Sequence, residues 1–148
     1  MSTIPFMVTG TQLGATIEQL KQFERVVIAT KHETFCHGDC IGVDAQAHDI
    51  VRRLRRDIGI CIHPSNIEDK RAYCVGAKAI SPVVHPLKRN QIMVDAADLV
   101  IVIPKTHQEQ RRSGTWATYR YAIKRGKRVM LIFPDGTVKV ETPETLGN

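Results

Sequence analysis

The run LVIVI at residues 99–103 constrains the fold of this chain more than any other feature of its sequence. An uninterrupted apolar run of this length, closed by Pro104, is typical of a strand that is buried on both faces. Such strands belong to parallel sheets, because the helices that connect parallel strands cover both sides of the sheet. A similar run, VMLIF at residues 129–133, predicts a second central strand.

Amphipathic stretches alternate with the short apolar runs, and this alternation indicates an α/β fold with a mostly parallel sheet. We expect helices near residues 16–31, 43–57, 86–97 and 113–125, and further strands near residues 5–8, 34–37, 58–63 and 137–140. Residues 64–82 show no clear period and predict a loop with a short turn. The length of 148 residues fits one domain, which we place at residues 1–141, with a loose tail at 142–148.

The net charge of +6 makes an anionic partner plausible, and much of the excess lies in basic runs at residues 52–56 and 124–128. Both runs fall where helices are expected to end, and cations at those ends complement the helix dipole without any partner. No interleaved aromatic residues or reading helix accompany them. We therefore favour solvated helix ends over nucleic-acid binding.

The cysteine spacing and the N-terminal residues indicate the cellular compartment in which the protein is expected. Cys36, Cys40, Cys61 and Cys74 follow no disulfide-scaffold spacing and contain no CxxC pair, so we expect free thiols and no structural metal or other cofactor. The N-terminus has no signal-peptide pattern, and no apolar segment is long enough to cross a membrane. These features predict a cytoplasmic protein with no membrane partner.

The motif HGDCIGVDAQAH at residues 37–48 places glycines and carboxylates at a strand-to-helix junction. Gly38 and Gly42 would let a ligand approach the backbone, and the first turn of the next helix offers unpaired N–H groups to an anion. Asp39 and Asp44 suit a ribose hydroxyl or a base N–H better than a phosphate. With His37, these residues predict a site for a nucleotide or sugar, whereas His48 is expected to be structural.

Two further loops should open at the same edge of a parallel sheet, because the carboxyl ends of its strands all meet there. One is Thr9-Gly10-Thr11, which follows the first strand. The other runs from Lys105 to Thr115 and ends with Ser113, Gly114 and Thr115 at a helix start, where hydroxyl and N–H groups suit a phosphate. A helix cap alone would also explain this triplet.

The helix expected from Pro86 brings Arg89 and Asn90 to the same edge if its crossover has the usual right hand. Arg89 would then be able to bind a phosphate through two hydrogen bonds. The alternative is that Arg89 is a surface arginine at a helix start and binds no ligand. Trp116 and Tyr119 would be candidates for stacking on a base, but aromatic residues on such a helix more often lie in the core.

These motifs, taken with RNQIMVDAADLVI at residues 89–101 and SGTWAT at residues 113–118, resemble the SLOG superfamily. This group includes the Lonely Guy phosphoribohydrolases, the Rossmann-like domain of DNA-processing protein A, and small bacterial and phage nucleotide-binding proteins. The similarity extends from the first strand to Pro134-Asp135-Gly136 and is greatest to the small stand-alone members. It implies a Rossmann-like three-layer sandwich that binds a nucleotide-derived ligand, often as a homodimer or higher homo-oligomer.

The resemblance also implies where catalysis would lie. Lonely Guy enzymes cleave the N-glycosidic bond of a nucleoside monophosphate with an arginine, which Arg89 matches in position, and a glutamate, at whose position this chain has Thr118. Asp39 or Asp44 would have to supply the missing carboxylate. We therefore favour a binding protein, a sensor or sequestering module, over an N-glycosidase with Asp39, Asp44 and Arg89 as candidate catalytic residues. A DNA-binding module is the third alternative.

Overall fold

Strand β5 (Leu99–Ile103) lies inside the sheet, and each of its residues is buried, as its apolar sequence predicts. It pairs in parallel with β1 (Phe6–Gly10) on one side and with β6 (Arg128–Ile132) on the other. The computed structural model describes residues 4–143. In this part of the chain one seven-stranded sheet has the order β4-β3-β2-β1-β5-β6-β7.

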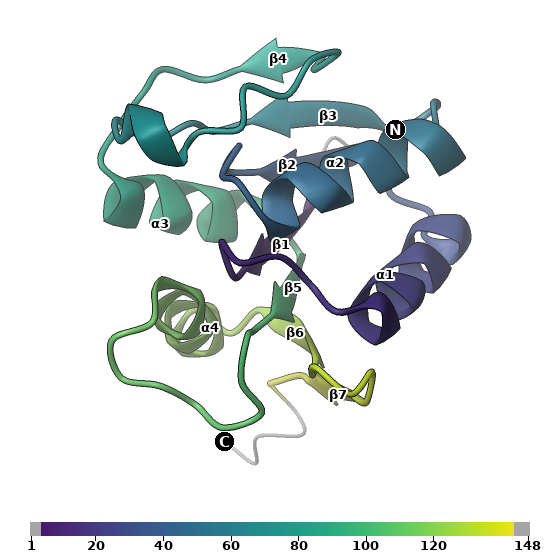
Figure 1. Cartoon of the computed structure of the whole chain (residues 1–148), viewed down its shortest axis with the longest axis vertical. Coiled ribbons are helices and arrows are strands. Elements are labelled where there is room, and N and C mark those ends of the chain that lie inside the picture. The colour runs from purple at the N-terminus through teal and green to yellow at the C-terminus, as the bar shows by residue number, and fades with distance from the viewer. Residues whose placement is uncertain (1–3, 144–148) are drawn as a thin grey trace.

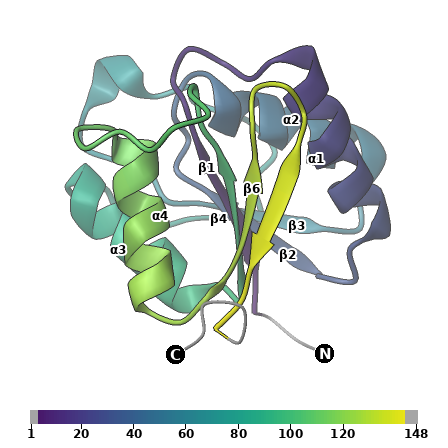
Figure 2. The same cartoon turned by 90° about the horizontal axis from the view of Figure 1, so that it is seen from below.

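The remaining strands are β2 (Thr34–His37), β3 (Gly59–Ile62), β4 (Ala79–Ile80) and β7 (Val138–Glu141). All neighbouring strands are parallel except β6 and β7, which join through the turn at Pro134-Asp135-Gly136. Helices α1 (Ile17–Ala29) and α2 (Val43–Leu54) cover one face, and α3 (Pro86–Ala96) and α4 (Gly114–Lys124) cover the other (Figures 1 and 2). The expected three-layer, Rossmann-like α/β sandwich is confirmed.

The capping signals in the sequence fix the starts of two helices. Thr16 Oγ1 accepts a hydrogen bond from the Gln19 N–H at 3.1 Å, and Gln19 Oε1 accepts one from the Thr16 N–H at 2.9 Å, which completes the predicted capping box. Ser113 Oγ accepts a hydrogen bond from the Trp116 N–H at 3.3 Å and caps α4.

Helix α2 ends at Leu54, before the predicted limit of residue 57, because Arg55 leaves the helical conformation. Its guanidinium donates hydrogen bonds to the carbonyls of Val27 and Thr30, both at 2.9 Å. It therefore binds backbone groups at the C-terminal end of α1, where unpaired carbonyls need donors. This part of the basic run has a structural role.

Residues 64–82 contain a short turn, as expected, which is the 3₁₀ turn η1 (Glu68–Lys70). They also contain strand β4, which the sequence pattern does not reveal because this strand is short and exposed and lacks apolar periodicity. At the C-terminus, Glu141 still belongs to β7, and residues 144–148 of the predicted tail lie outside the described residues.

The strand order reverses between β1 and β5, because β1 to β4 extend one way and β5 to β7 the other. From β1 the chain turns toward α1, whereas from β5 it turns toward α4 on the opposite face (Figure 2). A crevice opens at such a reversal. None of the described helices is both long and apolar enough for a membrane span.

Candidate functional site

A crevice of about 1060 Å³ lies at the point where the strand order reverses. The loops after β1 and β5 and the start of α3 form most of its wall. The residues that line it are Val8, Thr9, Gly10, Thr11, Gln12, Leu13, Cys40, Asp44, Pro86, Leu87, Arg89, Asn90, Met93, Lys105, Gln110, Arg111, Arg112, Ser113, Gly114, Thr115 and Trp116. The three loops singled out in the sequence therefore do converge, although His37, Gly38, Asp39 and Gly42 lie behind the lining residues.

The start of α4 is the open part of this wall. A Cβ atom added at Gly114 would meet nothing within 4 Å. Among the described residues, none accepts a hydrogen bond from the N–H of Gly114 or Thr115, since Ser113 Oγ binds Trp116 instead. Two N–H groups and the hydroxyl of Thr115 thus face a position that an anion can occupy.

The glycines of the 37–44 motif, in contrast, meet the protein itself. A Cβ at Gly38 would overlap the Arg89 guanidinium, and one at Gly42 would lie 2.5 Å from the carbonyl oxygens of Thr11 and Gln12. Gly42 also has a φ of +87°, a backbone conformation that residues with a side chain rarely adopt. These two glycines allow the loops behind the crevice to pack closely.

Arg89 is 6% exposed and holds this region together from α3. Its Nη1 donates hydrogen bonds to the carbonyls of Gly38 at 2.7 Å and His63 at 3.1 Å, and its Nε donates to Asn90 Oδ1 at 2.6 Å. Nη2 lies 3.6 Å from Cys40 Sγ. The predicted bidentate phosphate clamp would have to break some of these bonds, so Arg89 mainly brings a buried positive charge to the crevice.

Asp44 is the one carboxylate that lines the crevice, and it is 7% exposed. Its Oδ2 accepts hydrogen bonds from the N–H groups of Gly38 at 3.1 Å and Cys40 at 3.2 Å. Burial raises the pKa of Asp44 to about 6, and the nearby Arg89 charge opposes that rise. A carboxylate held this way can accept a hydrogen bond from a ligand hydroxyl or N–H.

Asp39 has a different environment. Its side chain is fully buried, and its oxygens accept hydrogen bonds from Arg71 Nε at 2.8 Å and from the Cys74 N–H at 2.9 Å. Burial raises its pKa, but these two hydrogen bonds outweigh that effect and lower it overall. Asp39 binds the segment before β4 to the back of the crevice, and it does not reach the lining.

His37 and His48 form a buried chain of hydrogen bonds behind Asp39. The Asp39 N–H donates to His37 Nδ1 at 2.9 Å, so this neutral ring carries its proton on Nε2 and donates to His48 Nδ1 at 2.8 Å. His48 Nε2 then donates to the Val75 carbonyl at 2.7 Å. Burial first, and then the proximity of His48, lower the pKa of His37 to about 3. The expected structural role of His48 fits this chain.

The same chain bears on metal binding. His37, His48 and Cys74 bring potential ligand atoms within 4.8 Å of one another. A metal ligand must offer an unprotonated nitrogen, but Nδ1 of His37 accepts a backbone hydrogen bond and its Nε2 holds the proton. The cluster therefore fits a hydrogen-bond chain better than a metal centre.

The loop from Lys105 to Thr115 was expected at this edge of the sheet, and it does line the crevice. Its cations Lys105, Arg111 and Arg112 were not named as site residues from the sequence, because no periodicity or motif marks them. Trp116 also lines the crevice, whereas the Tyr119 hydroxyl binds both oxygens of Glu141.

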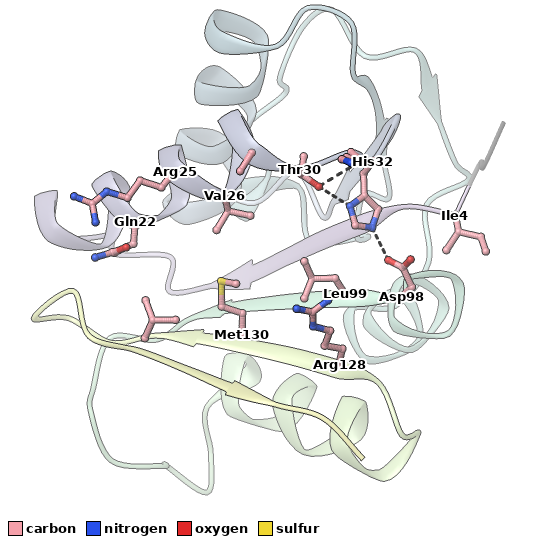
Figure 3. Close-up of a pocket in the computed structure, with 13 residues that line it drawn as sticks. Ile4, Gln22, Arg25, Val26, Thr30, His32, Asp98, Leu99, Arg128 and Met130 are labelled. Carbon is pink, nitrogen blue, oxygen red and sulfur yellow. Dashed lines mark hydrogen bonds and ion pairs between the residues drawn. The ribbon is translucent and has the colours of Figure 1, made fainter. Parts of the chain in front are cut away.

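A second cavity, of about 780 Å³, lies beside α1 on the face of β5, β6 and β7 (Figure 3). Aliphatic side chains such as Val26, Leu99 and Met130 form much of its wall. Its polar lining residues include Arg25, Lys31, Arg128 and His32, whose Nε2 lies 2.6 Å from Asp98 Oδ1. It lies near the start of β5, away from the loops that converge at the crevice.

Comparisons with known proteins agree with this architecture. The molybdenum cofactor binding protein from the phototrophic bacterium Rippkaea orientalis has a TM-score of 0.67 and 22% identity, covering 90% of this chain and 78% of that one. The protein TM1055, a structural-genomics target, has a TM-score of 0.59 and 15% identity, covering 84% of this chain and 71% of that one. No protein-family model and no curated protein matches the sequence. These likenesses establish a Rossmann-like fold, consistent with a SLOG-like one.

Proposed function

We propose that this chain binds a nucleotide or nucleotide-derived small molecule in the crevice, as a sensor or sequestering module. The observation that carries the proposal is the pairing of an open helix start at Gly114 with the buried carboxylate of Asp44 in one cavity. The N–H groups of α4 would bind phosphate, and Asp44 would accept a hydrogen bond from a ribose hydroxyl or base N–H.

The structural neighbours support the proposal at the level of the fold. One of them is a molybdenum cofactor binding protein, so a protein of this fold can hold a cofactor. The identity of 22% is too low to transfer that ligand to this chain. The homodimer that the SLOG resemblance implies, and a cytoplasmic location, remain predictions.

A panel of nucleoside phosphates, cyclic dinucleotides and ADP-ribose in a thermal-shift assay tests the proposal. A ligand at a hundredfold excess over its dissociation constant stabilises the folded state by about 2.7 kcal/mol, a shift that is easily measured. Asp44→Asn should then weaken binding by roughly tenfold or more, because it removes a charged acceptor. Asp49→Asn, on the exposed side of the same helix, is the matched control. If no compound in the panel raises the melting temperature, the proposal is wrong.

A second candidate function is N-glycosidic cleavage of a nucleoside monophosphate, and the position of Asp44 at the crevice favours it. With a pKa of about 6 this group is mostly ionised at neutral pH and would stabilise a positively charged sugar. Thr118, at the position of the family's glutamate, is buried and donates its hydroxyl hydrogen bond to the Gly114 carbonyl. We favour the binder, for which chromatography should recover the ligand intact. Release of free base that Asp44→Asn abolishes would favour the enzyme.

A further inference from the structure

The wall formed by residues 105–112 carries more positive charge than one phosphate can neutralise. Lys105, Arg111 and Arg112 line the crevice, and all three are exposed. Within residues 4–143, no carboxylate forms an ion pair with any of them. Arg89 adds a fourth cation to the lining, against the single carboxylate of Asp44. Like charges brought together without counterions destabilise the free protein, and an anionic ligand relieves that repulsion.

The wall is held in position by contacts with α4 and with Phe133. Trp116 Nε1 donates to Thr106 Oγ1 at 3.3 Å, and the His107 ring stacks on Phe133 with centroids 4.0 Å apart. Arg120 pairs with Glu109 at 2.6 Å and donates to the Arg111 carbonyl at 3.1 Å.

The pairing of Arg120 has an electrostatic consequence. Glu109 is the acidic residue of the 105–112 segment, and its carboxylate is already occupied by Arg120. It is therefore not available to neutralise Arg111 or Arg112, which leaves both guanidinium groups for a ligand. The segment is thus a preformed cationic surface, and ordering it on binding costs little entropy.

A phosphate at the start of α4 would use the N–H groups of Gly114 and Thr115 and leave these cations unoccupied. The volume of about 1060 Å³ lies at the upper end of the range for small-molecule sites, so the crevice has room for further groups. This inference rests on the proposed function: we propose that the ligand carries at least two linked phosphates. The inner phosphate binds the α4 start, and the outer phosphates bind Lys105, Arg111 and Arg112.

Calorimetric titration with adenosine and guanosine mono-, di- and triphosphates at fixed salt tests this inference. Affinity should rise about tenfold with the second phosphate, since each charge-assisted hydrogen bond contributes strongly. Raising the salt concentration should weaken the triphosphate more than the monophosphate.

The variant Arg111→Ala/Arg112→Ala should remove most of this gain, so it should weaken the triphosphate several times more than the monophosphate. The control Arg56→Ala/Lys78→Ala removes the same charge from exposed positions near the start of β3, at the opposite edge of the sheet, and should preserve the gain. Both variants change exposed side chains, so each is expected to fold.

The outcomes separate the inference from the proposed function. Equal affinity for mono- and triphosphates overturns the inference and leaves nucleotide binding intact, whereas no binding by any nucleotide overturns both. A gain that survives in Arg111→Ala/Arg112→Ala overturns the assignment to this wall. Tighter binding of single-stranded oligonucleotides than of any free nucleotide would show that the wall takes a nucleic-acid backbone and would also overturn the inference.

Discussion

Residues 37–44 and residues 113–115 carry the same local signal, glycine beside polar groups at a strand-to-helix junction, but the structure uses them differently. The protein fills the space beside the first pair of glycines with the Arg89 guanidinium and the backbone of Thr11 and Gln12. The space beside Gly114 is open. A glycine at such a junction thus indicates close approach, and its sequence context does not say whether a ligand or the protein approaches.

The two aspartates of the first segment differ in the same way. Asp39 is tied to Arg71 and Cys74 and has a lowered pKa, whereas Asp44 faces the crevice and has a raised one. Environments that push neighbouring carboxyl groups in opposite directions separate a structural role from a functional one. The closed segment supports the crevice, and Asp44 is the part of it that lines the crevice.

The largest effect is expected from Gly42→Ala in the closed segment. The substitution combines a strained φ of +87° with a clash against backbone atoms at 2.5 Å, and should lower the free energy of unfolding by about 4 kcal/mol. Gly126→Ala is the matched control, because Gly126 has φ +71° but nothing within 4 Å. It should cost about 1 kcal/mol in the same denaturant titration. Equal losses in the two variants would mean that the loops are not closely packed.

A smaller loss, about 2 kcal/mol at pH 7, is expected from Asp39→Asn, which leaves Arg71 without its buried partner. Because the folded state lowers the pKa of Asp39, its contribution is present above the unfolded value of about 4 and disappears as the pH falls through the folded value. The difference between the variant and the natural chain should therefore shrink in acid. Asp57→Asn, in an exposed pair with Arg55, is the control and should change stability little.

Asp44→Asn should show the opposite pH dependence. Since folding raises the pKa of Asp44 to about 6, the folded state binds its proton more tightly, and the natural chain loses stability from this group as the pH rises from about 4 to 6. The variant should gain about 2 kcal/mol relative to the natural chain between pH 4 and pH 7 in urea titrations. A loss that grows with pH would place Asp44 in the structural class of Asp39.

The regular part of the fold was predictable because its signals are local. The apolar run of β5 and the caps at Thr16 and Ser113 depend on residues a few positions apart, and the structure has them where the sequence places them. Strand β4 was missed because it is short, exposed and defined by its pairing with β3.

The interior of the candidate site was harder to predict because its contacts are distant in sequence. Arg89 reaches the Gly38 carbonyl across 51 positions, and no pattern near either residue records that contact. The sequence placed Arg89 and Gly38 at the same edge of the sheet. It did not show that Arg89 donates a hydrogen bond to the Gly38 carbonyl. The loop that carries the cations of the 105–112 wall was expected at the crevice because it follows a buried strand, but no motif marked the cations themselves.

The smallest effect on stability is expected from Gly114→Ala in the open segment. The added methyl group meets nothing, and alanine restricts the unfolded chain, so the free energy of unfolding should change by less than about 0.5 kcal/mol. The same methyl group would stand beside the N–H groups proposed to bind phosphate, so nucleotide affinity should fall severalfold in calorimetry. A stability loss as large as that of Gly42→Ala would show that this segment is closed as well. Unchanged affinity together with unchanged stability would move the phosphate away from the start of α4.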